Sequence, residues 1–475
     1  MDNDEMTRKM WTRFFAFEAL ALAAGVAIGL APPPDGLGVD AMRILGLLAW
    51  AIVNWVSRSA PDFAVALVMC CGWVALRVVP FNVAFASFAG TTPWLLTGAL
   101  GVSAAVAKSG LLSRMALHAM ALCSPTFRGQ TLAMLLAGTL LGAFIPSTSA
   151  KIAIAGAMST DIGEKLGFRD RSRGIVGMWA AMYTGFSLTA PMFLSSSFFG
   201  YMILALLPPD VQSRFTFGFW ALCMIPWAAT VLVGSYIAVI TIYRPEEEAS
   251  IPKRQISDMI ALMGPMKRDE WITLGVLLLC IFFWVFERRF GIPAAATAVV
   301  GMSLLISLNV ITVADYNSRI AWDLVTFVGG AMGLASVLGE VGVDVWIGSR
   351  LGPLMAGLTG SAYSFVTAVF VSVVLARFVI VDHMTCFTLY IVILTPVCIG
   401  AGINPWIAAI CCYAAVQQWF VKYQNYNFLG GFASAGGEER IGFGGTVKYC
   451  LAFNVISLAG VLVSVPYWRF LGLIP

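Results

Sequence analysis

The chain has 475 residues, of which 59% are apolar and only 11% are charged, and its mean hydropathy is +0.86. A soluble domain carries charge on roughly a quarter of its residues, so the composition excludes an ordinary soluble fold. The net charge of +4 indicates little by itself. No nucleic-acid partner is expected.

Apolar runs close to the ~20 residues that span a bilayer recur along the whole chain. We therefore predict an all-α polytopic membrane protein with about 11 transmembrane helices. The expected spans are 14–31, 42–57, 62–79, 94–107, 174–205, 216–241, 271–287, 291–309, 321–339, 404–433 and 445–466.

Two further apolar stretches, 131–158 and 362–399, are interrupted by polar clusters and are better interpreted as re-entrant hairpins of paired half-helices. The spans 174–205 and 404–433 contain similar interruptions and are predicted to be broken helices. The longest polar segment lies near the middle of the chain and is expected to be a linker. The predicted organisation is a first repeat at 1–241, a cytoplasmic linker at 242–270 and a second repeat at 271–475.

Basic residues concentrate before the first span, in 164–173 and in the central linker. Lys and Arg are enriched in cytoplasmic segments, so these parts are expected inside. The segments 32–41, 206–215 and 340–360 are poor in basic residues and are expected to be outer loops. The prediction is a multi-pass protein of the cell (inner or plasma) membrane with a cytoplasmic N-terminus.

Internal repetition supports two related halves. The glycines of 95–111 recur in 327–343 at an offset of 232 (330 − 98). Small residues at this spacing also serve helix packing in lipid, which is the simpler explanation. The same offset, however, carries Ser147 to position 379, three residues before Asp382, and Ser195 to Asn427. We therefore predict a duplication, with the halves inserted in opposite orientations.

Polar interruptions inside predicted spans have a physical cost. A helix that breaks in lipid leaves main-chain groups without partners, which is tolerated where they face a wet cavity. Broken-helix N-termini carry partial positive charge and suit an anion. The candidate binding residues come from four polar clusters, and are Ser147, Thr148, Ser149, Ser195, Ser196, Ser197, Asp382, His383, Thr385, Gln424, Asn425 and Asn427.

Charged residues in apolar context cost about 2.5–3.5 kcal/mol on insertion scales and usually face a cavity or each other. Lys151 and Lys422 are candidates to compensate the charge of an anion. Structural pairing is the alternative, for example of Asp382 with Arg377. For the serines the alternative is hydrogen bonding back to helix carbonyls.

These residues resemble the divalent-anion/sodium symporter family, which includes dicarboxylate, citrate and tartrate carriers. Ser147-Thr148-Ser149 stands at the first Ser-Asn-Thr hairpin tip of that family, and Ser195-Ser196-Ser197 matches its first unwound loop. Gln424-Asn425-Tyr426-Asn427 occupies the second loop without the usual Thr-Pro-Pro-Asn. The resemblance implies carboxylate binding at tips and loops, Na⁺ near Ser147 and Thr148 in cotransporting members, a homodimer and elevator-type movement.

The largest departure from the family is Asp382-His383-Met384 at the second hairpin tip. The pattern resembles the exchangers of this family more closely. In those proteins, basic side chains can occupy the positions at which sodium would bind in the symporters. Sodium-independent exchange or proton coupling is therefore favoured over sodium symport, and no cofactor other than Na⁺ or H⁺ is expected.

The predicted function is secondary active transport of small organic anions such as di- and tricarboxylates. An anion channel and a membrane-embedded hydrolase that uses a Ser/His pair are the alternatives. The sequence has no HExxH, GxSxG or P-loop motif, and its two histidines form no metal-ligand spacing with cysteine, so an enzyme and a resident metal are not expected.

Overall fold

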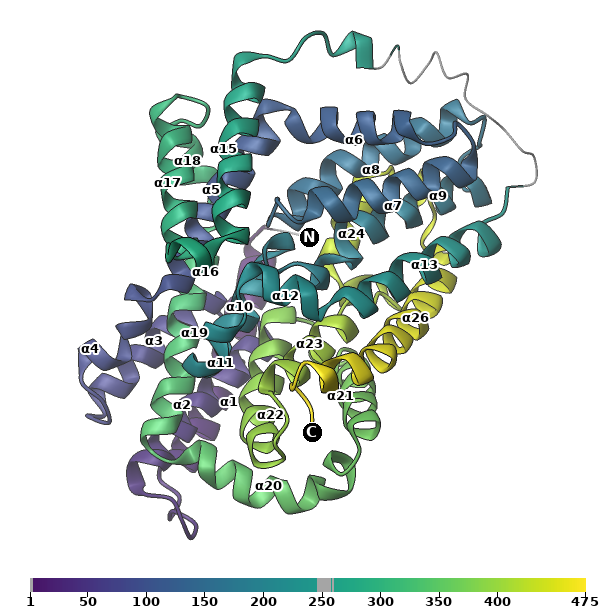
Figure 1. The fold of residues 1–475 in the computed structure, drawn as a ribbon. Coiled ribbons are helices and arrows are strands. Elements are labelled where there is room, and N and C mark those ends of the chain that lie inside the picture. The colour runs from purple at the N-terminus through teal and green to yellow at the C-terminus, as the bar shows by residue number, and fades with distance from the viewer. Residues whose placement is uncertain (1–2, 246–257, 259) are drawn as a thin grey trace.

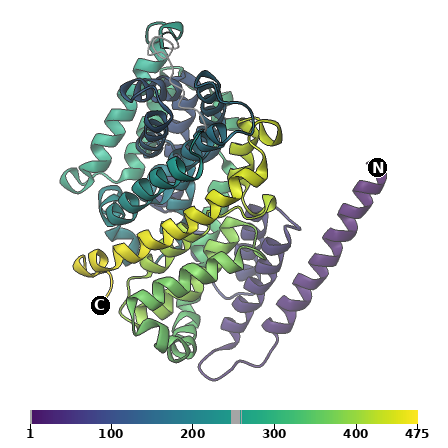
Figure 2. The same ribbon diagram turned by 90° about the vertical axis from the view of Figure 1, so that its right-hand side faces the viewer.

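The computed structural model describes residues 3–245, 258 and 260–475, and every regular element within them is a helix (Figure 1). The all-α prediction is confirmed. Figure 2 shows that the first helix lies at one edge of the molecule, beside the remaining bundle.

The helices of the first half are α1 (Asn3–Gly29), α2 (Val39–Ser57), α3 (Asp62–Ala75), α4 (Phe81–Ala84), η1 (Ala86–Ala89), α5 (Thr91–Ser109), α6 (Leu111–Leu122), α7 (Phe127–Gly142), α8 (Thr148–Lys165), α9 (Arg173–Tyr183), η2 (Thr184–Leu188), η3 (Ala190–Met192), η4 (Leu194–Ser196), α10 (Phe198–Leu206), α11 (Pro209–Arg214), α12 (Phe217–Cys223) and α13 (Ile225–Ile242).

Those of the second half are α15 (Arg268–Val285), α16 (Glu287–Phe290), α17 (Ala294–Ser307), α18 (Val313–Arg319), α19 (Trp322–Glu340), α20 (Val343–Thr359), α21 (Ala362–Ala376), α22 (His383–Gly400), α23 (Pro405–Ala415), η5 (Lys422–Gln424), α24 (Tyr426–Ser434), α25 (Gly437–Arg440) and α26 (Phe443–Phe470).

The two halves follow the same order of elements. A helix pair (α5 and α6, or α19 and α20) precedes a hairpin (α7 and α8, or α21 and α22). A broken helix comes next (α9 and α10, or α23 and α24), and a long helix (α13 or α26) closes each half. The starts of α6 and α20 differ by 232 residues (343 − 111), as do those of α9 and α23 (405 − 173). The offset that the glycines indicated therefore recurs between whole elements.

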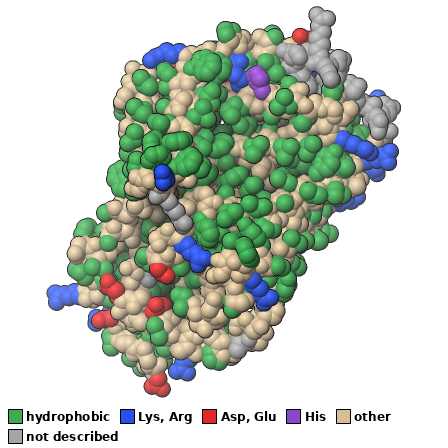
Figure 3. All heavy atoms as spheres, in the orientation of Figure 1, with side chains coloured by type: hydrophobic (Ala, Val, Ile, Leu, Met, Phe, Trp, Pro, Cys, Tyr) green, Lys and Arg blue, Asp and Glu red, His purple; other side chains and the backbone are tan. Residues whose placement is uncertain are grey.

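Five described helices are long and apolar enough to cross a membrane, and six if α5 and α6, bent by 68°, count as one span. Several other apolar helices have only 10–17 residues, among them the half-helices α21 and α23. The count of about 11 spans remains a prediction. Figure 3 shows hydrophobic side chains over most of the upper part of one face, as expected of a surface in contact with lipid.

The structure corrects two sequence predictions about loops. The predicted outer loop 340–360 contains α20, and 206–215 contains the short α11. In α20, Asp344, Arg350 and Pro353 interrupt the apolar run, so it lacks the signal of a membrane span although its backbone is helical. Likewise the first hairpin extends over 127–165, beyond the predicted 131–158, because its outer turns are too polar to be recognised as part of a span.

Candidate anion-binding site

Both broken helices unwind over more than one turn. The first stops at Tyr183, continues through the π turn η2 and two 3-10 turns, and resumes with α10. Pro191 lies in this break and has no main-chain N–H to continue a helix. The second stops at Ala415 and resumes with α24 after the single turn η5. We call residues 184–197 the first break and residues 416–425 the second break.

Four helices begin at the hairpin tips and breaks, and each has a side-chain cap at its N-terminus. Ser147 accepts from Ala150 N at 3.3 Å at the start of α8, and Ser197 accepts from Phe199 N at 3.3 Å at the start of α10. The equivalent residues in the second half are acidic or amide side chains. They are Asp382, which accepts from Thr385 N at 2.7 Å, and Asn425, which accepts from Phe428 N at 3.1 Å.

The first hairpin tip contacts the first break directly. The buried amine of Lys151, in the first turn of α8, donates to the Ser196 carbonyl oxygen at 2.6 Å, and Ser195 donates to the Ala143 carbonyl. The N-termini of α8 and α10 therefore lie next to each other.

The second hairpin tip contacts the helices that follow both breaks, and it contacts the second break itself. The ring of His383, at the start of α22, stacks on Phe199 of α10 with centroids 5.2 Å apart and meets Tyr426 of α24 edge-on at 5.4 Å. Arg377, just before the tip, donates to the Gln424 carbonyl and to the Ile380 carbonyl, the latter at 2.9 Å. The N-terminus of α22 thus lies between those of α10 and α24.

Helices α8 and α24 close the ring. A Cβ on Gly430 would lie 3.4 Å from Ile152, and one turn further along both helices Gly156 lies against Ser434. Because the contacts advance in the same direction, α8 and α24 are parallel and their N-termini are side by side. The four N-termini therefore form one closed set, in the order α8, α24, α22 and α10.

Several buried polar atoms near these N-termini have no hydrogen-bond partner within the described part of the chain. They are Thr148 Oγ1, Thr385 Oγ1, Gln424 Nε2 and Asn427 Oδ1, in residues that are at most 3% exposed. A buried polar atom without a partner costs about 1–3 kcal/mol. These four atoms are therefore candidates for groups that a solute completes.

The charge around the helix starts is positive overall. Lys151 and Arg377 are fully buried, whereas Asp382 is 12% exposed and pairs with Arg58, which follows α2, at 3.6 Å. Within the described part of the chain, the ion-pair partner of Asp382 is thus Arg58 and not Arg377, the partner considered from the sequence. Each helix N-terminus adds roughly half a positive charge, about two over the four.

Not every candidate residue belongs to this set. Lys422 is half exposed, forms an ion pair with Glu438 and covers the ring of Phe443 at 5.4 Å, so its charge is engaged elsewhere. Ser149 is exposed beside the first tip. Arg58 was not predicted, because nothing in its sequence surroundings indicates that a residue between α2 and α3 reaches a hairpin more than 300 positions later.

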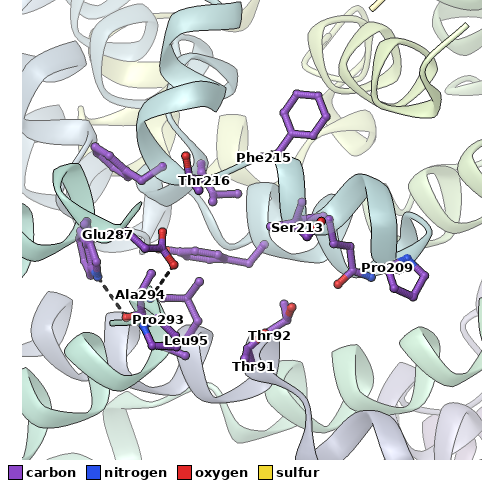
Figure 4. Close-up of a pocket in the computed structure, with 17 residues that line it drawn as sticks. Thr91, Thr92, Leu95, Pro209, Ser213, Phe215, Thr216, Glu287, Pro293 and Ala294 are labelled. Atoms are coloured by element: carbon purple, nitrogen blue, oxygen red, sulfur yellow. Dashed lines mark hydrogen bonds between the residues drawn. The ribbon is translucent and has the colours of Figure 1, made fainter. Parts of the chain in front are cut away.

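A separate cavity of about 270 Å³ lies between the ends of α5, α17 and α10–α12 (Figure 4). Its one lining carboxylate, Glu287, accepts from Ala294 N at 3.0 Å and so caps α17. The cavity borders the first break through Leu194 and Tyr201, but none of the four capping residues lines it.

Comparison with known proteins decides the family. The sequence model described as "Sodium:sulfate symporter transmembrane region" matches residues 9–473. The chain belongs to this family. The resemblance inferred from the hairpin tips and loops is thereby confirmed, and the family is one of membrane transporters and not of enzymes, as expected.

Relatives of this symporter family member include plant and bacterial proteins. The chloroplastic dicarboxylate transporter 1 of Spinacia oleracea is 26% identical over 354 residues, which cover 71% of this chain and 61% of that protein. The chain thus spans less than two thirds of that relative. The inner membrane protein YbhI of Escherichia coli is 25% identical, with 76% of this chain and 78% of that protein covered.

A solved structure shares the fold. MtrF of Neisseria gonorrhoeae, described within a class of antimetabolite efflux pumps, superposes with a TM-score of 0.57. The match covers 96% of this chain and 94% of that one at 13% identity, so the likeness concerns the fold alone.

Proposed function

We propose that the chain is a secondary transporter of small dicarboxylates. The observation that carries this proposal is the closed set of four helix N-termini, beside which several polar atoms have no partner among the described residues. Four N-termini offer about two positive charges, which balance the two carboxylates of such a solute. The name of the spinach relative, a dicarboxylate transporter, supports the same solute class.

The binding residues that we propose are the side chains that cap the four helices, those that have no partner in the described part of the chain, and those that join the hairpin tips to the breaks and the helices after them. They are Ser147, Thr148, Ser195, Ser196, Ser197, His383, Thr385, Gln424, Asn425 and Asn427, with Asp382 as a cap and Lys151 as a compensating charge.

Coupling without sodium is supported by two equivalent contacts. Lys151 donates to the carbonyl of Ser196, and Arg377 donates to the carbonyl of Gln424. Each carbonyl belongs to the residue directly before the helix cap in its break, Ser197 or Asn425. Unwound carbonyls of this kind coordinate small cations in transporters, and here side-chain cations contact them. We therefore propose exchange or proton coupling, with sodium symport near Ser147 and Thr148, which the family name favours, as the second candidate.

The proposed mechanism is alternating access of the elevator type in a homodimer, with two inverted repeats and a cytoplasmic N-terminus. The hairpins and broken helices contact one another at all four starts, which supports their movement as one unit. The helices α1–α6 and α15–α20 would form the scaffold. A hydrolase has little support, since no serine is among the hydrogen-bonding and ring partners of His383 in the described part of the chain, which are Arg377, Phe199 and Tyr426.

The test is uptake of radiolabelled succinate by purified protein in proteoliposomes, with sulfate as the second solute. We expect saturable uptake that internal succinate accelerates and that replacing Na⁺ with K⁺ leaves unchanged. Non-saturable flux would indicate a channel, and an altered product an enzyme. Uptake that requires Na⁺ would overturn the coupling proposal, and transport of sulfate alone would overturn the solute class.

A further inference from the structure

Helix α26 touches both breaks through two consecutive residues. The hydroxyl groups of Tyr449 and Thr184 lie 2.5 Å apart, and Thr184 is the first residue of the π turn in the first break. The neighbouring Cys450 Sγ accepts from the main-chain N–H of Trp419 at 3.1 Å, inside the second break. Tyr449 and Cys450 are both fully buried.

The direction of the first contact follows from proton counting. A threonine hydroxyl has one hydrogen, and Thr184 donates it to the Ala180 carbonyl at 2.7 Å. Tyr449 must therefore donate to Thr184 Oγ1. The hydrogen bond from Tyr449 therefore fixes Thr184, the residue at which helix α9 changes into the π turn η2.

The second contact satisfies a main-chain group that has left its helix. A buried N–H without a partner is rare because it forfeits the hydrogen bond it made with water. Trp419 lies four residues after the end of α23, and its N–H finds the thiol of Cys450 instead of a helix carbonyl. A thiol is a weak acceptor, so this amide is held less firmly than one within a helix.

The two breaks also meet each other at this place. The rings of Tyr183, directly before the first break, and Trp419, in the second, have centroids 5.2 Å apart, and Trp419 lies 6.3 Å from Tyr449. Two consecutive residues of α26 thus contact both breaks at the place where the breaks lie next to each other.

We propose that Tyr449 and Cys450 are positioning residues that hold the two breaks in register, so that the four helix N-termini face one solute together. The effect on transport rests on the proposed function, whereas the effect on backbone order does not. Loss of either hydrogen bond loosens only one of the two breaks. Binding is weakened in both cases, because the solute contacts helix N-termini that follow both breaks.

Hydrogen–deuterium exchange of the solubilised protein without solute tests the first part. Cys450→Ala should speed exchange in peptides that contain Trp419, and Tyr449→Phe in those that contain 184–189. Cys450→Ser should restore slow exchange, because a hydroxyl accepts at least as well as a thiol. Ser464→Ala is the matched control, since Ser464 is buried on the same helix and, among the described residues, its hydroxyl bonds only the Gly460 carbonyl of that helix, at 2.7 Å.

Uptake measurements test the second part. Tyr449→Phe and Cys450→Ala should each raise the KM for succinate about fivefold to tenfold, roughly the effect of one hydrogen bond, with Ser464→Ala unchanged. Unchanged exchange in both breaks would overturn the positioning role, as would faster exchange with an unaltered KM. Failure of the wild-type protein to take up succinate would count against the proposed function and leave the exchange result standing.

Discussion

Two buried threonines of the first hairpin differ in whether their hydroxyl is used inside the protein. Thr139 donates to the Leu135 carbonyl at 2.8 Å and lies 3.1 Å from the Thr189 hydroxyl. Thr148, 3% exposed at the start of α8, has no partner for its hydroxyl in the described part of the chain. Burial of such a group lowers stability unless a ligand completes it.

Replacement of Thr148 by valine therefore separates solute binding from folding. We expect the melting temperature of Thr148→Val without solute to stay unchanged or rise, because no hydrogen bond is lost. Its affinity for succinate should fall about 5- to 30-fold, the equivalent of about 1–2 kcal/mol. Thermal-shift titration with succinate measures both quantities. As control, Thr139→Val should lower the melting temperature. Wild-type affinity in Thr148→Val would remove this residue from the site.

The hairpin helix α7 and the first break approach each other with no side chain between them. A Cβ added to Gly138 would lie 2.4 Å from the carbonyl carbon of Gly185, and one added to Gly185 would lie 2.4 Å from the Met134 carbonyl oxygen. Both neighbours are backbone atoms, which cannot rotate away as a side chain can. Glycine at these two positions therefore sets the distance between hairpin and break.

The substitution Gly138→Ala should consequently destabilise the protein and slow uptake. Overpacking of this kind costs about 1–3 kcal/mol, which should appear as a lower melting temperature. Gly275→Ala in α15 is the matched control. A Cβ there meets nothing within 4 Å, so alanine should stabilise the helix by roughly 0.5–1 kcal/mol. Equal melting temperatures for the two variants would contradict the close approach.

At the level of helices, the sequence predicts which helices are interrupted better than it predicts the residue at which each begins to unwind. Pro191 and the triple serine mark the first break, but its true start at Thr184 lies in a run whose residues are nearly all apolar or small, so no polar signal announces it. The supporting Tyr449 and Cys450 could not be found from the sequence, because α26 is a continuous apolar helix. Contacts between distant elements, such as Arg58 with Asp382, leave no local pattern.

Over the whole molecule, ion pairs outside the predicted spans join the two halves. Lys108 at the end of α5 pairs with Asp315 of α18 at 2.6 Å. Arg440 of α25 pairs with Glu164, at the end of the first hairpin, and with Asp170, just after it. The most buried pair joins Arg114 of α6, 9% exposed, to Glu270 of α15, 3% exposed, at 2.6 Å. Arg114 also donates to the Gly264 carbonyl at 2.9 Å, and so fixes the end of the central linker on the first half.

This last pair predicts an acid-sensitive link between the halves. Hydrogen bonds from the Arg114 guanidinium lower the pKa of Glu270 from its ordinary value of 4.5, although burial opposes the shift. A lowered pKa in the folded state means that the carboxylate adds stability above pH 4.5, and that this stability is lost as the pH falls below 4.5.

Removing one partner of a buried pair costs about 3 kcal/mol or more, so the melting temperature of Glu270→Gln should lie well below that of the wild-type protein at pH 7. The difference should shrink in melting curves recorded from pH 5 towards pH 3.5, while the exposed Glu439→Gln should track the wild-type protein throughout. A gap that stays constant across this range would show that Glu270 contributes through its shape and not through its charge.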